Sequence, residues 1–119
     1  MRRILVVDDE RDVADVLHIG LERAGFKTTV AYDPDDALKK FSECEYDTVI
    51  LDVMMPVMDG YALYRKMLEI NPEIKVCFLT GFDIPYFRGL DKEQHYVHNI
   101  LLAKKPILFS ELVRVLRDE

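Results

Sequence analysis

Three acidic side chains, one hydroxyl and one ammonium group each come at or soon after the end of a short apolar run. The acidic residues are Asp8, Asp9 and Asp52, and the other two groups belong to Thr80 and Lys105. Short apolar runs rich in β-branched residues are typical of buried strands. The carboxyl ends of parallel strands share one edge of a sheet, where α/β proteins bind their ligands. We therefore expect these five groups to converge on one site.

Three carboxylates at one site repel one another, so the site needs a cation to keep them charged. Oxygen ligands with room for water favour Mg²⁺, which commonly binds one or two carboxylates together with a phosphate. Such an ion would also reduce the repulsion between Asp52 and an incoming phosphoryl group. Asp52 could then act as nucleophile and form an acyl phosphate, while Lys105 and Thr80 neutralise the phosphoryl oxygens. This combination predicts phosphoryl-transfer chemistry.

The rest of the sequence predicts five strands that alternate with five helices. The expected strands cover residues 4–7, 27–31, 48–51, 74–79 and 100–103. The expected helices begin near residues 12 and 34, cover 60–70, form a short irregular segment within 82–99 and end with 108–116. Parallel strands need crossover connections, and these are right-handed. We therefore expect an α/β fold with an open five-stranded parallel sheet and helices on both faces.

Length and composition limit the classes of function. The chain has 119 residues, a formal net charge of −6 and 50% hydrophobic residues. These values predict a single domain over residues 1–119 with no effector domain, and the acidic balance makes direct binding of nucleic acid unfavourable. The apolar runs are too short for a signal peptide or a membrane span. We therefore expect a cytoplasmic protein that makes no contact with a membrane.

Four short motifs surround the groups at the predicted strand ends. They are Val-Val-Asp-Asp-Glu at 6–10, Leu-Asp-Val-Met-Met-Pro-Val-Met-Asp-Gly at 51–60, Leu-Thr-Gly at 79–81 and Lys-Pro at 105–106. With these motifs in this order and spacing, the chain resembles the CheY-like receiver domains of response regulators in two-component signalling. The resemblance covers essentially the whole chain, and it implies a single receiver domain with a flavodoxin-like (βα)5 fold.

The resemblance also implies a set of residues for Mg²⁺. Asp9 would bind the ion directly, and Asp8 would bind it mostly through water. Asp52 and the backbone carbonyl of Met54 would complete the protein ligands. Asp52 would also be the phosphoacceptor, so the metal site and the phosphorylation site would share one carboxylate.

Thr80 and Lys105 would then report the phosphorylation. The resemblance implies that Thr80 is the switch hydroxyl and that Lys105 pairs with the phosphoryl group. A histidine kinase or a phosphotransfer protein would supply this group, and an unidentified downstream effector protein would bind in response. The chain would be a monomer or a weak phosphorylation-dependent dimer. It would not be an enzyme, beyond promoting its own Mg²⁺-dependent phosphorylation and dephosphorylation.

Three alternatives remain open at this stage. The family's aromatic switch position holds Leu102 here, so a degenerate receiver that binds partners without phosphorylation is one alternative. An aspartyl-phosphate hydrolase of the haloacid dehalogenase type would need a second Asp where this chain has Met54. A flavodoxin-like protein would bind the flavin phosphate through backbone amides and hydroxyls rather than through clustered carboxylates.

Overall fold

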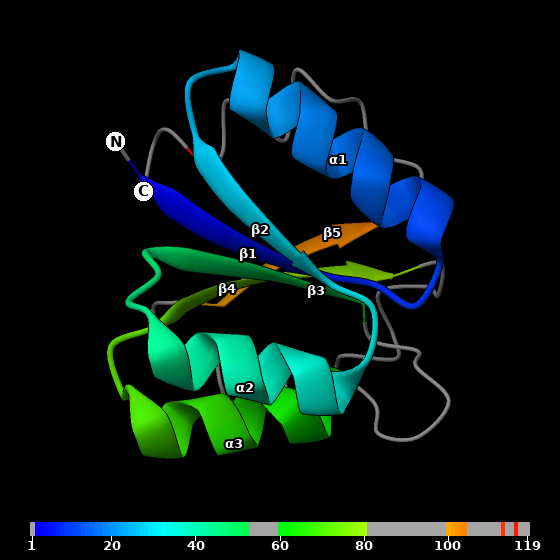
Figure 1. Ribbon diagram of the computed structural model, residues 1–119. Coiled ribbons are helices and arrows are strands. Elements are labelled where there is room, and N and C mark those ends of the chain that lie inside the picture. The colour runs from blue at the N-terminus through cyan, green and yellow to red at the C-terminus, as the bar shows by residue number, and fades with distance from the viewer. Residues whose placement is uncertain (1, 53–59, 81–99, 105–112, 114–115, 117–119) are drawn as a thin grey trace.

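A computed structural model describes residues 2–52, 60–80 and 100–104, together with 113 and 116 (Figure 1). The strands are β1 (Arg3–Val7), β2 (Lys27–Ala31), β3 (Thr48–Asp52), β4 (Lys75–Thr80) and β5 (Ile100–Lys104). The helices are α1 (Arg11–Arg23), α2 (Pro34–Glu43) and α3 (Gly60–Ile70). Among these described helices, none has both the length and the apolar character that crossing a membrane requires.

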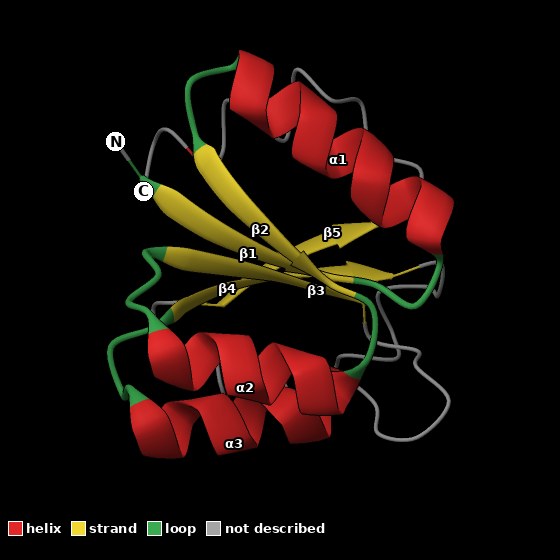
Figure 2. Cartoon of the chain, viewed as in Figure 1, coloured by secondary structure: helices red, strands yellow, loops and turns green. Residues whose placement is uncertain are grey.

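All five predicted strands form one parallel sheet in the order β2-β1-β3-β4-β5. Helix α1 covers one face, and α2 and α3 lie side by side on the other (Figure 2). The prediction of a parallel sheet with helices on both faces is therefore confirmed. The expected segment 82–99 lies outside the described residues. Of the expected last helix, the structure describes Val113 and Leu116, which are both helical.

The central strands contain continuous apolar runs, as expected where helices cover both faces of the sheet. In β1, Leu5 and Val7 face the layer of α2 and α3, whereas Ile4 and Val6 face α1. All four side chains are fully buried. Leu116 packs in the cluster on the α1 side, which places this residue of the last helix on that face. Such two-sided burial explains why continuous apolar runs, rather than alternating ones, predicted the strands.

Two local signals fix the ends of helices. The side chain of Asp33 accepts a hydrogen bond from the Asp36 backbone N–H at 2.8 Å, and Pro34 follows as the first residue of α2. Asp33 is therefore the N-cap of α2, which agrees with the expected start of this helix near residue 34. Gly25 follows α1 with φ = +100°, a conformation that glycine adopts without steric cost.

Phe78 gives a direct test of the packing beneath the site. Its ring is fully buried on β4 and meets Tyr64 of α3 edge-on, with 5.6 Å between the ring centroids. We expect Phe78→Ala to lower the free energy of unfolding by about 3–5 kcal/mol, because it removes a buried ring and leaves a cavity. Val16→Ala, at a side chain that is 66% exposed, is the control and should change it by less than about 0.5 kcal/mol. Urea denaturation measures both, and equal effects would contradict the packing described here.

Candidate functional site

Two buried carboxylates meet at the carboxyl edge of the sheet. Asp8 follows β1 directly, and Asp52 is the last residue of β3. These strands are neighbours, and their register pairs Val7 with Leu51. Asp8 and Asp52 are the residues that directly follow this pair along the chain. Their exposed fractions are only 2% and 5%. Sheet register therefore brings together two acidic residues that are far apart in the sequence.

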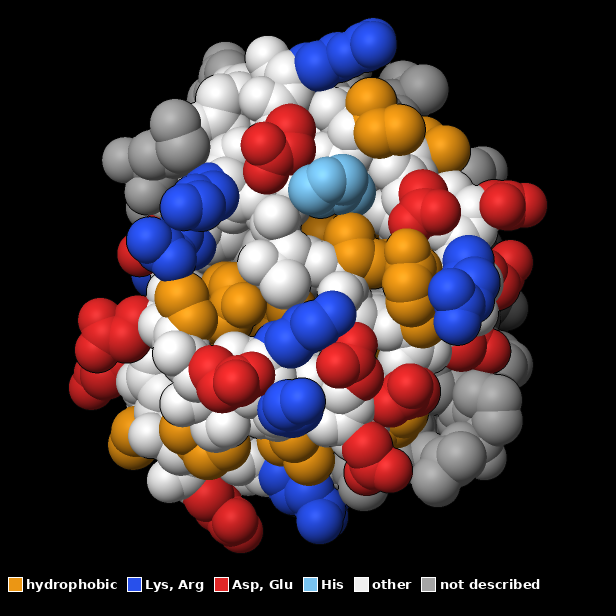
Figure 3. All heavy atoms as spheres, in the orientation of Figure 1, with side chains coloured by type: hydrophobic (Ala, Val, Ile, Leu, Met, Phe, Trp, Pro, Cys, Tyr) orange, Lys and Arg blue, Asp and Glu red, His pale blue; other side chains and the backbone are white. Residues whose placement is uncertain are grey.

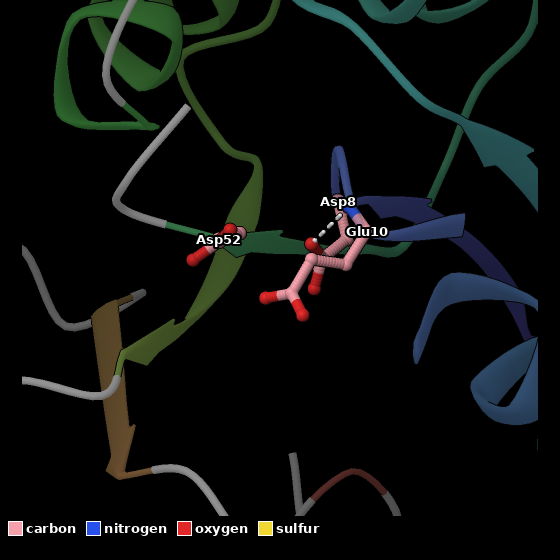
Figure 4. A group of neighbouring side chains, drawn as sticks. All are labelled: Asp8, Glu10 and Asp52. Carbon is pink, nitrogen blue, oxygen red and sulfur yellow. Dashed lines mark hydrogen bonds between the residues drawn. The ribbon is translucent and has the colours of Figure 1, made fainter. Parts of the chain in front are cut away.

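A third carboxylate, that of Glu10, joins this pair. One carboxylate oxygen from each of Asp8, Glu10 and Asp52 lies within 4.8 Å of the others (Figure 4). Glu10 lies in the connection between β1 and α1, and its backbone N–H donates to Asp8 Oδ1 at 3.0 Å. The Asp8 backbone N–H donates in turn to the Ala31 carbonyl at 3.2 Å. These bonds hold the chain so that Glu10 is placed beside the other two acids.

The donor set of this three-carboxylate group fits Mg²⁺. All three donors are hard oxygen atoms, and two belong to side chains that are almost fully buried. Close carboxylates in such a place repel one another, and a divalent cation offsets that repulsion. Mg²⁺ prefers carboxylate oxygens and keeps several water ligands. Glu10 is exposed to solvent, so water can reach an ion at this group. The cluster is therefore compatible with a magnesium site.

The other predicted site residues fall into three cases. Thr80 ends β4, and the register that pairs Leu79 with Asp52 brings its backbone to the same edge. Asp9 is exposed, and it does not belong to the three-carboxylate group of the described residues. Met54 and Lys105 lie outside the described residues. Their predicted roles, the role of Asp9 as a ligand and the role of the Thr80 hydroxyl all stay predictions.

Glu10 belongs to the site although its sequence context did not predict a role for it. The available signal was its position directly after two acids at a strand end. That signal is weak, because acidic residues before a helix are common for reasons of capping and helix dipole. Here Glu10 occupies the N-cap position of α1 without a side-chain capping hydrogen bond. Its carboxylate instead lies near Asp8 and Asp52.

Glu10→Gln tests the contribution of this third carboxylate. The change keeps the shape of the side chain and removes its charge, so we expect the Mg²⁺ dissociation constant to rise about tenfold, as for residues that support a metal site. Isothermal titration with MgCl₂ on the unphosphorylated protein measures it. Asp12→Asn, an exposed acid in the first turn of α1, is the charge-matched control. Equal effects of the two changes would mean that Glu10 acts only through net charge.

Sequence comparisons identify known proteins that are similar to this chain. Residues 4–115 match the family model for the response regulator receiver domain. The response regulator receiver protein CpdR of Brucella abortus is 37% identical over 113 residues, which cover 95% of this chain and 92% of CpdR. The transcriptional regulatory protein PrrA of Mycobacterium tuberculosis is 37% identical over 79 residues. That match covers 66% of this chain but only 34% of PrrA, so the matched residues make up about a third of that longer regulator.

Structural comparison gives the same result. The crystal structure of the response regulator protein TrrA from Thermotoga maritima, in complex with Mg²⁺-BeF, matches with a TM-score of 0.83 and 30% sequence identity. The match covers 99% of this chain and 98% of TrrA. TrrA was thus crystallised with a magnesium ion and a fluoride of beryllium, and its fold is shared over nearly the full length of both chains.

Proposed function

Because this chain belongs to the family of response-regulator receiver domains of two-component signalling, we propose that it signals by accepting a phosphoryl group on Asp52. The observation that supports this most strongly is the buried Asp52 carboxylate, which lies within 4.8 Å of the acids of Asp8 and Glu10. A buried carboxylate at a strand end, next to others of like charge, does not stabilise the core, because burial and repulsion both disfavour its charge. It is well placed to act as a nucleophile beside a cation.

The reaction that we propose is a displacement at phosphorus. A carboxylate oxygen of Asp52 attacks the phosphorus of a phosphohistidine on a histidine kinase or a phosphotransfer protein. The new P–O bond forms as the P–N bond breaks, and the bonding electron pair returns to the imidazole nitrogen of the donor. The product on this chain is an acyl phosphate. The chain would promote its own phosphorylation and dephosphorylation and would catalyse no other reaction.

The acidic residues around Asp52 would hold Mg²⁺ during this transfer. The closeness of Asp8 and Glu10 to Asp52 supports this role for them, and Asp9 and the Met54 carbonyl are added from the family resemblance. When bound, Mg²⁺ neutralises negative charge on the carboxylates and on the phosphoryl oxygens. The N–H of Glu10 keeps Asp8 oriented through the bond to its Oδ1. Asp52 would act as the attacking group.

The signal would leave the site through Thr80 and Lys105. Thr80 lies at the end of β4, the strand next to β3, and Lys105 follows β5 directly. In the proposed mechanism the Thr80 hydroxyl and the Lys105 ammonium group bind phosphoryl oxygens once Asp52 is modified. The resulting movement changes the surface seen by a downstream effector protein. Both roles are taken from the family resemblance.

Incubation with acetyl phosphate and MgCl₂, followed by intact-mass spectrometry, tests this function. We expect the mass of one phosphoryl group to be added, and we expect hydroxylamine to remove it because it cleaves acyl phosphates. A chain that stays unmodified under conditions that label a known receiver domain would refute the proposal. That outcome would favour a degenerate receiver that binds its partners without phosphorylation.

A further inference from the structure

Strand β2 forms one edge of the sheet, and the direction of its backbone groups can be assigned. It pairs with β1 alone. The Lys27 N–H donates to the Arg2 carbonyl at 2.9 Å, and the Ala31 carbonyl accepts from the Asp8 N–H at 3.2 Å. Successive residues of a strand direct their backbone groups to opposite sides, so Thr28 and Val30 point theirs away from β1. Outward-pointing groups of this kind are a template for an added strand.

One of these outward groups is bound by a side chain of α1. The Thr28 backbone N–H donates to Glu22 Oε2 at 2.6 Å, and the Thr28 hydroxyl donates to the same oxygen at 3.0 Å. A ring nitrogen of His18, one turn earlier on α1, contacts that hydroxyl. The hydrogen bonds from Thr28, chiefly from its backbone N–H, lower the pKa of Glu22. At neutral pH the acceptor is thus a carboxylate.

Another outward group is bound from the opposite layer. Lys40 Nζ of α2 donates to the Val30 carbonyl at 2.6 Å, and the same ammonium group pairs with Asp36 at 2.9 Å. Helices α1 and α2 lie on opposite sides of β2 (Figure 1). Figure 3 views this edge from outside, where the band between the two helices shows white backbone and polar atoms together with hydrophobic side chains in orange and charged side chains in red and blue. A carboxylate and an ammonium group therefore reach the edge from the two faces of the sheet.

The groups so occupied are those that a second copy of the chain would use. In an antiparallel pair of β2 strands related by a twofold axis at Thr29, Thr28 lies opposite Val30 of the second copy. The Thr28 N–H would then donate to the Val30 carbonyl of that copy, and the reverse bonds would form as well. The strand is therefore complementary to itself. Glu22 and Lys40 compete for the donor and the acceptor on which such pairing depends.

We propose that Glu22 and Lys40 close the β2 edge against strand addition by a second copy of this protein. An added strand must break a hydrogen bond to a carboxylate and one from an ammonium group, and these are stronger than bonds between neutral groups. It must also leave both charges without these partners close to the new interface. The edge is thereby kept out of self-association, whatever surface binds the signalling partners.

Amide hydrogen exchange measured by NMR tests whether Glu22 occupies the outward N–H of Thr28. In the wild-type protein we expect the Thr28 amide to be protected although it points away from the sheet. Glu22→Ala should raise its exchange rate at least tenfold, while the Lys27 and Thr29 amides, which point to β1, should be unchanged. Unchanged exchange at Thr28 would contradict the proposal, and this measurement needs only the single variant.

Sedimentation velocity over a range of concentrations tests whether Glu22 and Lys40 together prevent self-association. The double variant Glu22→Ala/Lys40→Met keeps the net charge and should self-associate at least tenfold more tightly than the wild-type protein. The control Lys39→Met/Glu43→Ala makes the same change of charge at exposed positions of α2 and should match the wild type. In the double variant the Val30 amide should become protected as concentration rises. A folded double variant that sediments like the control, or associates without protection of Val30, would overturn the proposal.

Discussion

Asp52→Asn is expected to abolish phosphorylation by acetyl phosphate and to leave the fold intact. The asparagine side chain fits the same space but offers no carboxylate oxygen to attack phosphorus, so the loss should be complete rather than partial. Asp52 is 5% exposed and ends a strand in which every residue is buried. The shape of the variant side chain preserves this packing. Intact-mass spectrometry measures the modification, and far-ultraviolet circular dichroism checks the fold.

Asp35→Asn is the matched control for this experiment. Asp35 is an exposed acid in the first turn of α2, so its replacement makes the same chemical change outside the site. It should be phosphorylated like the wild-type protein. A phosphoryl group still gained by the Asp52 variant under the same conditions would show that another residue is the acceptor, and peptide mapping after borohydride reduction would identify it.

Removal of divalent cations has the second largest expected effect. In EDTA the acids of Asp8, Glu10 and Asp52 repel an incoming phosphoryl group as well as one another. We expect the rate of phosphorylation to fall by at least about a hundredfold, equivalent to about 2.7 kcal/mol in the barrier. Addition of MgCl₂ in excess should restore the rate. Undiminished phosphorylation in EDTA would refute the role of the cation.

Thermal unfolding measures the binding of the same cation independently of phosphorylation. A ligand that binds only the folded state stabilises it by about 1.4 kcal/mol at ten times its dissociation constant. Mg²⁺ should therefore raise the unfolding temperature of the wild-type protein. The increase should be smaller for Asp52→Asn, which has lost one of the three carboxylates of the cluster. Equal increases for both proteins would place the binding site elsewhere.

The sequence predicted the strands well because a parallel sheet buries both faces of each strand. The boundaries differ by a residue where a local hydrogen bond decides them. Ile74 was expected to begin a strand, but its N–H donates to the Asn71 carbonyl at 3.2 Å, so β4 begins at Lys75. The edge strand β5 extends to Lys104, one residue further than expected, because Lys104 pairs with Thr80 of β4. Periodicity does not reveal either bond.

The site was predictable to the extent that sheet order determines it. Asp8 and Asp52 end neighbouring strands, and any parallel sheet with β1 beside β3 brings them together. Glu10 was not predictable in this way, because its place depends on the local path of the chain after Asp8 and on the bond from its own N–H. Asp9, next in sequence to Asp8, is exposed. The difference between these neighbours is one of loop conformation, which apolar patterning does not specify.

The alternation of side chains in β1 has a consequence for how this chain tolerates changes in length. Leu5 and Val7 belong to one core cluster, and Ile4 and Val6 belong to the other. A single residue inserted within the strand would send each later side chain to the opposite face and would turn Asp8 away from its present position. Insertions should therefore be accepted in the exposed turn at Pro72 and Glu73 but not in the strands that precede the acids.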